Sequence, residues 1–326
     1  MLPRPVSTDR RHGFTTRYTS SSALKSLLNR SRATNLAVLG LVFFTAVSFL
    51  LNVKLYYFSF LDPKPSSAPF PLNILAPVTN IHSNLKHLII VPGHGIWKGT
   101  NPDLRLKTDE WTFESYGTSK ESSRLEVFFQ HISNAARLAL EDQRSLVVFS
   151  GGQTQPTSTT TEGESYLRLA LSANLFQSDT FNRATSESYA LDSFQNLLFS
   201  IARFREYTGS YPEQITVVGY EMKRARFMDL HRAAIRWPEN RFNYIGIDAN
   251  EDNSQARQGE RQNGYLPYLE DIYGCHGFLA NKRRQRNHHA RFPPYYSSCP
   301  EMGPLLGWCP EVYTQLFSGD VPWSTS

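Results

Sequence analysis

The 326-residue sequence lacks the short motifs of several common enzyme classes. It has no Gly-x4-Gly-Lys-Ser/Thr loop and no complete Gly-x-Gly-x-x-Gly fingerprint, the two glycine-rich signatures of nucleotide-binding enzymes. Gly-x-Ser-x-Gly, the nucleophile turn of serine esterases, is missing as well. The sequence therefore gives no support for nucleoside triphosphate hydrolysis or for serine-esterase chemistry.

Cysteine is scarce, and the three cysteines, Cys275, Cys299 and Cys309, all lie near the C-terminus. Their spacing, taken with the histidines near them, matches no standard zinc finger, so we predict no metal site. If this part of the chain lies in an oxidising compartment, we expect one intramolecular disulfide within residues 275–309. The two pairings we favour are Cys299–Cys309 and Cys275–Cys299, with the third cysteine free.

Acidic residues are almost absent from residues 1–35, which hold seven basic residues and only Asp9 as an acid. The net charge of this tail is +6, whereas that of the whole chain is +5, so the rest of the chain has a net charge of −1. A body without a net positive charge is unlike a nucleic-acid-binding domain. We therefore predict no nucleic-acid partner.

Charge is absent altogether from residues 33–53, whose dense apolar part runs from Leu36 to Leu51. This length is near the lower limit for a helix that spans a membrane. A cleaved signal peptide or a buried core helix would also be apolar, but the long basic lead favours a retained anchor. We predict a single-pass type II protein of the secretory pathway (Golgi or ER), with the mitochondrial inner membrane as the alternative.

The remaining chain divides by composition. Apolar runs at 87–91, 146–149, 215–218 and 242–247 alternate with helical patterns, including 162–175, 185–207 and 221–237. Such alternation predicts an α/β fold, Rossmann-like and three-layered, with a parallel sheet. The expected parts are a basic cytosolic tail (1–32), a transmembrane anchor (33–53), a Pro-rich stem (54–84), the Rossmann-like domain (85–250) and an irregular C-terminal extension packed on it (251–326).

Glycines follow two of the predicted strands: Gly93 after 87–91, and Gly151 with Gly152 after 146–149. We expect these turns to leave bare backbone N–H groups at the edge of the sheet where open α/β proteins bind ligands. Bare N–H groups suit a phosphate or a carboxylate. The alternative is that the glycines only form tight turns.

Polar residues follow these turns. Glu162 and Glu187 are expected to begin helices, where they can act as a general acid–base pair, serve as metal ligands, or merely favour a helix N-terminus. Ser193 and Asn196 are three residues apart and so share a helix face, with Asn196 nine residues into its helix. Arg224, near a helix start, can hold an anion or pair with Glu221.

The order of these motifs resembles the family called domain of unknown function 218, which includes bacterial SanA, YdcF and ElyC proteins. The similarity covers about residues 85–248, and the extension is similar to a eukaryotic, mainly fungal branch. Two positions differ from the family pattern, with Glu221 in place of a histidine and Ser193 in place of a threonine. The matching segments are Val91-Pro92-Gly93, Ser150-Gly151-Gly152, Glu162, Glu187 with Ser193 and Asn196, and Glu221-Met222-Lys223-Arg224-Ala225.

The resemblance implies a Rossmann-like domain, a membrane-anchored role in envelope biogenesis, and S-adenosylmethionine as a candidate cofactor. We predict a membrane-anchored domain that binds an anionic or nucleoside-type ligand, either as an enzyme on glycan- or lipid-linked substrates or as a non-catalytic binding module or structural partner. We expect the site residues to meet in one cleft. The catalytic candidates are Glu162 and Glu187, and the ligand-binding candidates are Gly93, His94, Gly151, Gly152, Gln153, Ser193, Asn196, Glu221 and Arg224.

Overall fold

The computed structural model describes residues 21–61, 82–113, 121–249 and 254–324. The chain forms two compact units, Met1–Ser67 and Ala68–Ser326, which are described separately below. Most of the predicted stem lies outside the described residues.

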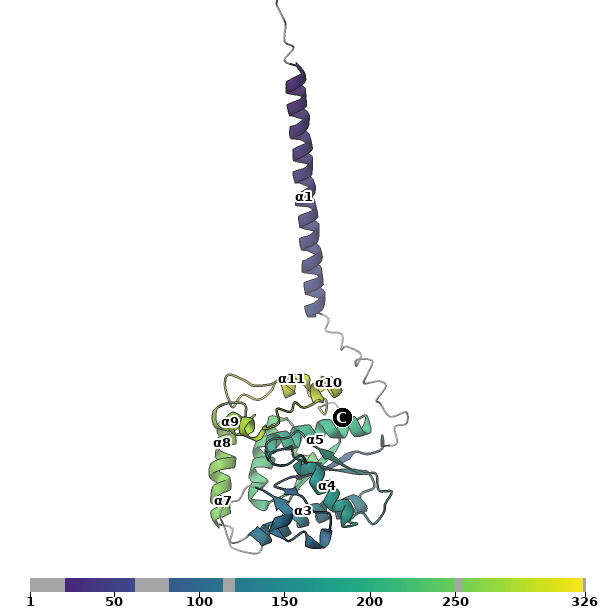
Figure 1. The fold of residues 1–326 in the computed structure, drawn as a ribbon, viewed down its shortest axis with the longest axis vertical. Coiled ribbons are helices and arrows are strands. Elements are labelled where there is room, and N and C mark those ends of the chain that lie inside the picture. The colour runs from purple at the N-terminus through teal and green to yellow at the C-terminus, as the bar shows by residue number, and fades with distance from the viewer. Residues whose placement is uncertain (1–20, 62–81, 114–120, 250–253, 325–326) are drawn as a thin grey trace, which may run out of the picture. The chain divides into compact units, whose positions relative to one another are not determined.

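The first unit contains one long helix, α1 (Ser21–Leu61) (Figure 1). Its segment Asn35–Tyr56 has a mean hydropathy of 2.4 and buries none of its residues, so it is long and apolar enough to cross a membrane. Polar side chains within it are satisfied locally, since Asn52 Nδ2 donates to the carbonyl of Ser48. A signal sequence would have the same properties, so the retained anchor and the compartment stay predictions.

The second unit is built on a five-stranded parallel sheet, which confirms the predicted α/β class. The spatial order is β5-β4-β1-β6-β7. The strands are β1 (His87–Pro92), β4 (Ser145–Ser150), β5 (Ala184–Glu187), β6 (Gln214–Gly219) and β7 (Phe242–Gly246).

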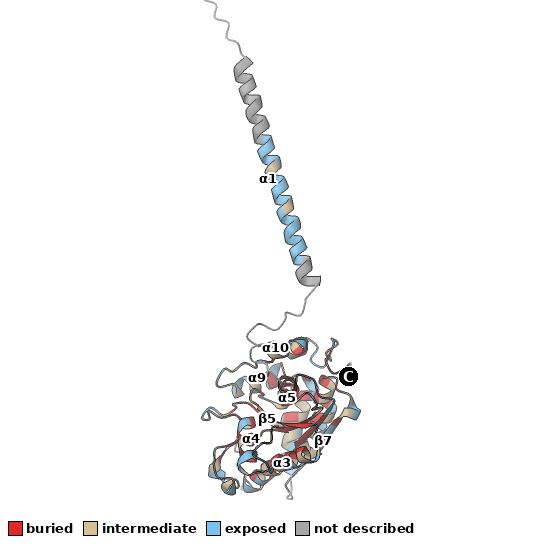
Figure 2. Cartoon of the chain, turned by 90° about the vertical axis from the view of Figure 1, so that its right-hand side faces the viewer, coloured by how far each residue is buried: buried red, intermediate tan, exposed pale blue. Residues whose placement is uncertain are grey.

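Helices cover both faces of the sheet, and Figure 2 shows buried residues concentrated between them. Side chains such as Ile89 and Val147 pack under α3 (Glu121–Glu141) and α4 (Glu162–Ser172). Their neighbours Leu88 and Leu146 point to the other face, under α5 (Ser193–Thr208). The strands that follow β1 are added on one side of it (β4, β5) and then on its other side (β6, β7), so the strand order reverses between β1 and β6. Open α/β sheets bind ligands at such a switch point.

Strand β5 corrects the predicted helix over 185–207. Residues 184–187 pair with β4, and α5 begins only at Ser193, where the Asp192 carboxylate caps it by accepting the Gln195 N–H. Glu187 therefore ends a strand and does not begin a helix. Asn196 is the fourth residue of α5 and lies in its first turn, close to the sheet edge, and not nine residues along.

The predicted helix over 221–237 is also different. After β6 the chain forms a 3-10 turn, η3 (Glu221–Lys223), then the π-helical η4 (Arg226–His231) and the short α6 (Arg232–Ala234). Widened turns of this kind are frequent at functional sites. They change which side chains of the segment point toward the sheet edge.

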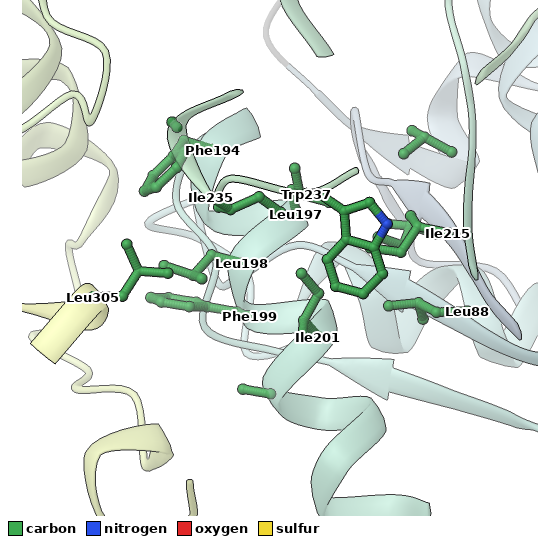
Figure 3. Close-up of a cluster of buried hydrophobic side chains, with 14 of the residues drawn as sticks. Leu88, Phe194, Leu197, Leu198, Phe199, Ile201, Ile215, Ile235, Trp237 and Leu305 are labelled. Atoms are coloured by element: carbon green, nitrogen blue, oxygen red, sulfur yellow. The ribbon is translucent and has the colours of Figure 1, made fainter. Parts of the chain in front are cut away.

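The C-terminal extension is a series of short helical segments that complete the core. Leu305 packs near Leu198 and Phe199 of α5 (Figure 3), and the indole of Trp323 is fully buried, donating from Nε1 to the carbonyl of Ile235. The segments are α7 (Ser254–Glu260), η6 (Arg261–Tyr265), α8 (Leu266–Glu270), α9 (Gly277–Arg286), α10 (Tyr295–Ser298), η7 (Pro300–Met302) and α11 (Gly303–Leu306).

Smaller elements complete the unit. The residues after β1 form a two-stranded antiparallel ribbon, β2 (Ile96–Trp97) with β3 (Trp111–Thr112), and its connection contains the 3-10 turns η1 (Pro102–Leu104) and η2 (Thr108–Glu110). A further 3-10 turn, η5 (Glu239–Arg241), leads into β7.

One disulfide is present, as predicted, but both favoured pairings were wrong. The bond joins Cys275 to Cys309, and Cys299 is free and buried. Cys299 lies against α5, where its thiol donates to the carbonyl of Ala202, so packing in the core removes it from the other two cysteines.

Candidate functional site

The switch point brings together side chains from the turns after β1 and β6. Lys223, at the end of η3, places its amine 3.3 Å from Nδ1 of His94, which follows β1. The same amine lies 5.5 Å from the centre of the Tyr220 ring. We call His94, Tyr220 and Lys223 the switch-point site. Lys223 was not among the residues predicted from the sequence.

Lys223 is the residue of this site whose charge the fold alters most. Burial, reinforced by the charge of Arg226, lowers the pKa of its amine to about 7, although the side chain keeps part of its surface exposed. The carboxylates of Glu260 and Glu162 act in the opposite direction, and Arg286 adds to the lowering. Near neutral pH the amine therefore exchanges readily between a cation and a neutral nucleophile or base.

The histidines around Lys223 are neutral. Burial, and next the charge of Lys223, lowers the pKa of His94 well below its usual range. Burial likewise lowers the pKa of His131 to about 4, and Nε2 of that ring lies 3.0 Å from the carbonyl oxygen of Ile247. Among the described residues, His94 Nε2 has no hydrogen-bond partner although it is buried. The hydrogen-bonding capacity of this nitrogen is therefore unused.

The glycine turns do not leave bare N–H groups, contrary to expectation. The N–H of Gly93 donates to the Ser150 carbonyl at 2.7 Å, that of Gly151 to Glu187 at 3.1 Å, and that of Gly152 to Ala190 at 2.6 Å. Backbone carbonyls at the same sheet edge thus occupy all three donors. These three N–H groups are therefore not available to an anion.

The glycines instead make room for Glu162. A Cβ on Gly93 would lie 2.5 Å from Cβ of Glu162, and one on Gly151 would lie 2.6 Å from its Oε2. Thr154 fixes the other carboxylate oxygen, donating to Oε1 at 2.6 Å. Glu162 is therefore clamped against the ends of β1 and β4, next to Gly93, the residue that precedes His94 of the switch-point site.

Glu187 is fully buried and accepts four hydrogen bonds. Its donors are the N–H groups of Tyr189 and Ala190 and the hydroxyls of Ser150 and Tyr295, at 2.7–3.2 Å. Burial raises the pKa of the carboxyl, while these donors oppose that change. With no exposed surface, Glu187 is arranged to join β4, β5 and the extension and not to contact a ligand.

Asn196 belongs to the same buried network. Its Oδ1 atom lies 2.9 Å from Oγ of Ser150, which lies 2.8 Å from Glu187 Oε2. One hydroxyl proton cannot serve both acceptors, but a flipped amide would let Nδ2 donate to Ser150, and Ser150 could then donate to Glu187. Because Asn196 lies in the first turn of α5, its amide reaches Ser150, the residue before Gly151. The amide therefore supports the turn at Gly151.

The other predicted residues lie elsewhere. Ser193 Oγ lies 2.8 Å from Nε2 of His231, a buried ring whose pKa is lowered by burial and then by Arg226 and Arg283. Gln153 donates to the Ser158 carbonyl and holds its own loop. Neither side chain is hydrogen-bonded to the switch-point site.

Arg224 and Glu221 bind each other. Two guanidinium nitrogens lie 2.7 Å from the two carboxylate oxygens, and Arg224 also donates to the Tyr244 carbonyl. Hydrogen bonds from Arg224 lower the pKa of Glu221. Arg224 lines a surface hollow of about 500 Å³ along β7, together with Met228 and Asn243, so the predicted residues do not all share one cleft.

Sequence reasoning missed three further residues. Arg226 and Glu260 form an ion pair at 3.2 Å with each side chain 10% exposed, and Tyr295 reaches Glu187 from the extension. Lys223 and Arg226 flank Arg224 in the sequence. A 3-10 turn in place of the expected helix directs these two side chains, and not Arg224, toward the site, so a correct prediction of the turn would have identified them. No periodic pattern marks Glu260 or Tyr295.

Comparison with known proteins identifies a distant relative. The chain is 29% identical over 296 residues to an uncharacterized protein of Saccharomyces cerevisiae, an alignment that covers 73% of this chain and 97% of the yeast protein. No family model matches the chain. No solved structure matches it either. The resemblance to domain of unknown function 218 therefore stays a prediction.

Proposed function

We propose that this protein is anchored to a membrane by α1 and binds a small anionic ligand at the switch-point site. The observation that carries the proposal is the position of Lys223, whose amine lies beside His94 where the strand order reverses. Ligands of open α/β sheets bind outside the carboxyl ends of the strands at such a point.

The surrounding charges favour an anion. The cations of the site are Lys223 itself and, acting on it, Arg226 and Arg286, and they outnumber the carboxylates of Glu260 and Glu162, of which Glu260 is paired with Arg226. A protonated Lys223 is opposed by burial and by neighbouring cations, so a bound anion would restore the missing balance. Phosphate and carboxylate groups fit this requirement, including those of a nucleotide or of S-adenosylmethionine, the candidate that the family resemblance suggests.

Catalysis is the second candidate, and the clamped carboxylate of Glu162 favours it. Thr154 and the two glycine turns hold this group in one orientation at the ends of β1 and β4, and proton transfer requires such a positioned group. A glycan- or lipid-linked anion at a membrane of the secretory pathway would suit an anchored enzyme. The non-catalytic alternative is a binding module for a nucleoside-type ligand or a structural partner in a membrane complex.

The proposal is tested with the full-length protein in detergent micelles. Thermal unfolding is measured with inorganic phosphate, nucleotides, sugar phosphates and S-adenosylmethionine, for the wild type, Lys223→Met and Lys98→Met. Lys98 is an exposed lysine after β2 and is the matched control. We expect at least one anion to raise the Tm of the wild type and of Lys98→Met but not of Lys223→Met.

Equal stabilisation of all three proteins, or no stabilisation by any anion, would refute the proposed site. Mass spectrometry of the stabilising compound after incubation then separates the two candidates. Consumption that is lost in Glu162→Gln indicates an enzyme, and an unchanged compound indicates a binding module.

A further inference from the structure

The C-terminal extension holds a second cluster of chemically reactive side chains, remote in sequence from the proposed site. The ligand-type atoms of Cys275, His276 and Cys309 all lie within 4.8 Å of one another. Nε2 of His276 is 3.3 Å from Sγ of Cys309, and Sγ of Cys309 is bonded to that of Cys275. Because 34 residues separate the two cysteines, only the fold brings the three side chains together.

Contacts other than the disulfide hold this arrangement. The carboxylate of Asp271 accepts the backbone N–H groups of Cys275 and His276, at 3.3 and 2.8 Å. The His276 ring stacks on Tyr313 with 3.9 Å between ring centres, and its Nε2 lies 2.9 Å from the Pro310 carbonyl oxygen. Reduction of the disulfide removes none of these contacts, so the imidazole stays beside the two sulfur atoms.

We propose that the reduced protein binds one thiophilic divalent ion, such as Zn²⁺, through Cys275, His276 and Cys309. A tetrahedral ion with Zn–S bonds of about 2.3 Å separates two sulfur ligands by roughly 3.8 Å. The three ligand atoms all lie within 4.8 Å of one another, so after reduction the two sulfur atoms need only a small movement apart to hold the ion. Cys309 is exposed and the other two are partly exposed, which gives the ion a path from solvent and leaves a fourth position for water.

The chemistry balances in two steps. A dithiol reductant of the thioredoxin class supplies two electrons and two protons, which convert the disulfide into two thiols while the reductant becomes a disulfide. The ion then displaces both thiol protons and bonds to two thiolates and to the neutral imidazole. Nε2 contributes its lone pair, so the imidazole proton resides on Nδ1 and the contact with Pro310 is released.

The disulfide and the metal site exclude each other, because the same two sulfur atoms form both. An oxidising compartment selects the disulfide, and a reducing compartment with available zinc selects the metal site. This part of the extension would thus be cross-linked under both conditions, by different chemistry.

The test uses the full-length protein in detergent micelles, first reduced by a phosphine and then titrated with Co²⁺. We expect a sulfur-to-cobalt charge-transfer absorption that saturates at one ion per chain and is abolished by Zn²⁺. His276→Gln should weaken binding by more than about tenfold, because even outer-shell partners of metal ligands are commonly worth about 10–100-fold in affinity. His288→Gln, an exposed histidine of the same extension, and Cys299→Ser are the controls and should retain affinity.

A second measurement does not depend on the fold of any variant. Wild-type protein is reduced, incubated with or without Zn²⁺, and alkylated under native conditions, and the labelled cysteines are identified by mass spectrometry. We expect Zn²⁺ to protect Cys275 and Cys309 together. Unprotected thiols, an absent cobalt–sulfur band, or full affinity in His276→Gln would overturn the proposal.

Discussion

At the scale of single residues, Lys223 links charge to stability. Its pKa is about 7 in the folded protein against a usual value of 10.5, so between these values the unfolded chain binds more protons than the folded one. Stability therefore rises with pH across this window. We expect Lys223→Met to remove this rise and to be most stabilising, relative to the wild type, at and below about pH 7.

Urea unfolding from about pH 6 to about pH 9 measures this effect. Lys98→Met is the control and should keep the wild-type slope, because Lys98 is exposed. A slope in Lys223→Met equal to that of the wild type would show that the folded protein does not depress the pKa of this amine.

Asn196 is the second residue whose contribution can be isolated. Asn196→Ala removes an amide from a buried network and leaves the Ser150 hydroxyl short of a partner. We expect a loss of about 1–3 kcal/mol in the free energy of unfolding, the range for an unsatisfied buried polar group. Any stabilisation by the ligand should be lost too, because the amide supports the Gly151 turn. Asn240→Ala, at an exposed position in η5, should change neither quantity.

At the scale of elements, the extension and the sheet are joined through Tyr295 in α10. Its hydroxyl donates to the buried carboxyl of Glu187 at 2.9 Å. We expect Tyr295→Phe to lower the free energy of unfolding by about 1–3 kcal/mol, because the variant leaves Glu187 with three donors. The neighbouring Tyr296 is 52% exposed, so Tyr296→Phe is a matched control that should be nearly neutral in chemical denaturation. Equal losses in the two variants would contradict the role of Tyr295.

Apolar runs made most of the sheet predictable from the sequence. β1, β4 and β6 are covered by helices on both faces, and burial on both faces requires continuous apolar residues. The sequence of β5, Ala-Thr-Ser-Glu, has no apolar run. Its polar side chains can be buried because the fold supplies their partners: Thr185 accepts from Arg203, and Glu187 accepts from Tyr295. The missed strand also displaced the expected start of α5, and with it the expected position of Asn196.

The site, like the sheet, was predictable only in part. Gly93 and Gly151 directly follow strands and Glu162 begins the next helix, so position alone identified them. The glycines, however, accommodate a carboxylate and lack bare N–H groups. Lys223 was missed because a regular helix was assumed after β6. A 3-10 turn followed by a π-turn depends on tertiary packing, and no periodicity in the sequence reports it.

At the scale of the whole molecule, the orientation of the chain can be measured directly. The basic residues before α1 favour a cytosolic N-terminus and a body on the opposite side of the membrane. A glycosylation acceptor engineered into residues 64–70 should then be modified in cells. Protease protection of the N-terminal tail, with digestion of the body, would contradict this orientation.

The state of the cysteines is a separate test of compartment. In protein isolated without reductant, denatured and alkylated, we expect label on Cys299 only, because Cys275 and Cys309 are bonded to each other. Mass spectrometry of the peptides gives the answer. Label on all three cysteines would indicate a reducing environment and would make the metal-bound form the relevant one.

The hydrogen bond between Glu187 and Tyr295 also has a consequence for biosynthesis. The two residues are 108 positions apart, so the strand that carries the carboxylate is synthesised long before its last donor. Because synthesis runs from the N-terminus, the sheet lacks this donor until residue 295 has been made. During this interval the carboxylate of Glu187 lacks its last donor, and the surface of β5 that the extension later covers is open to a chaperone.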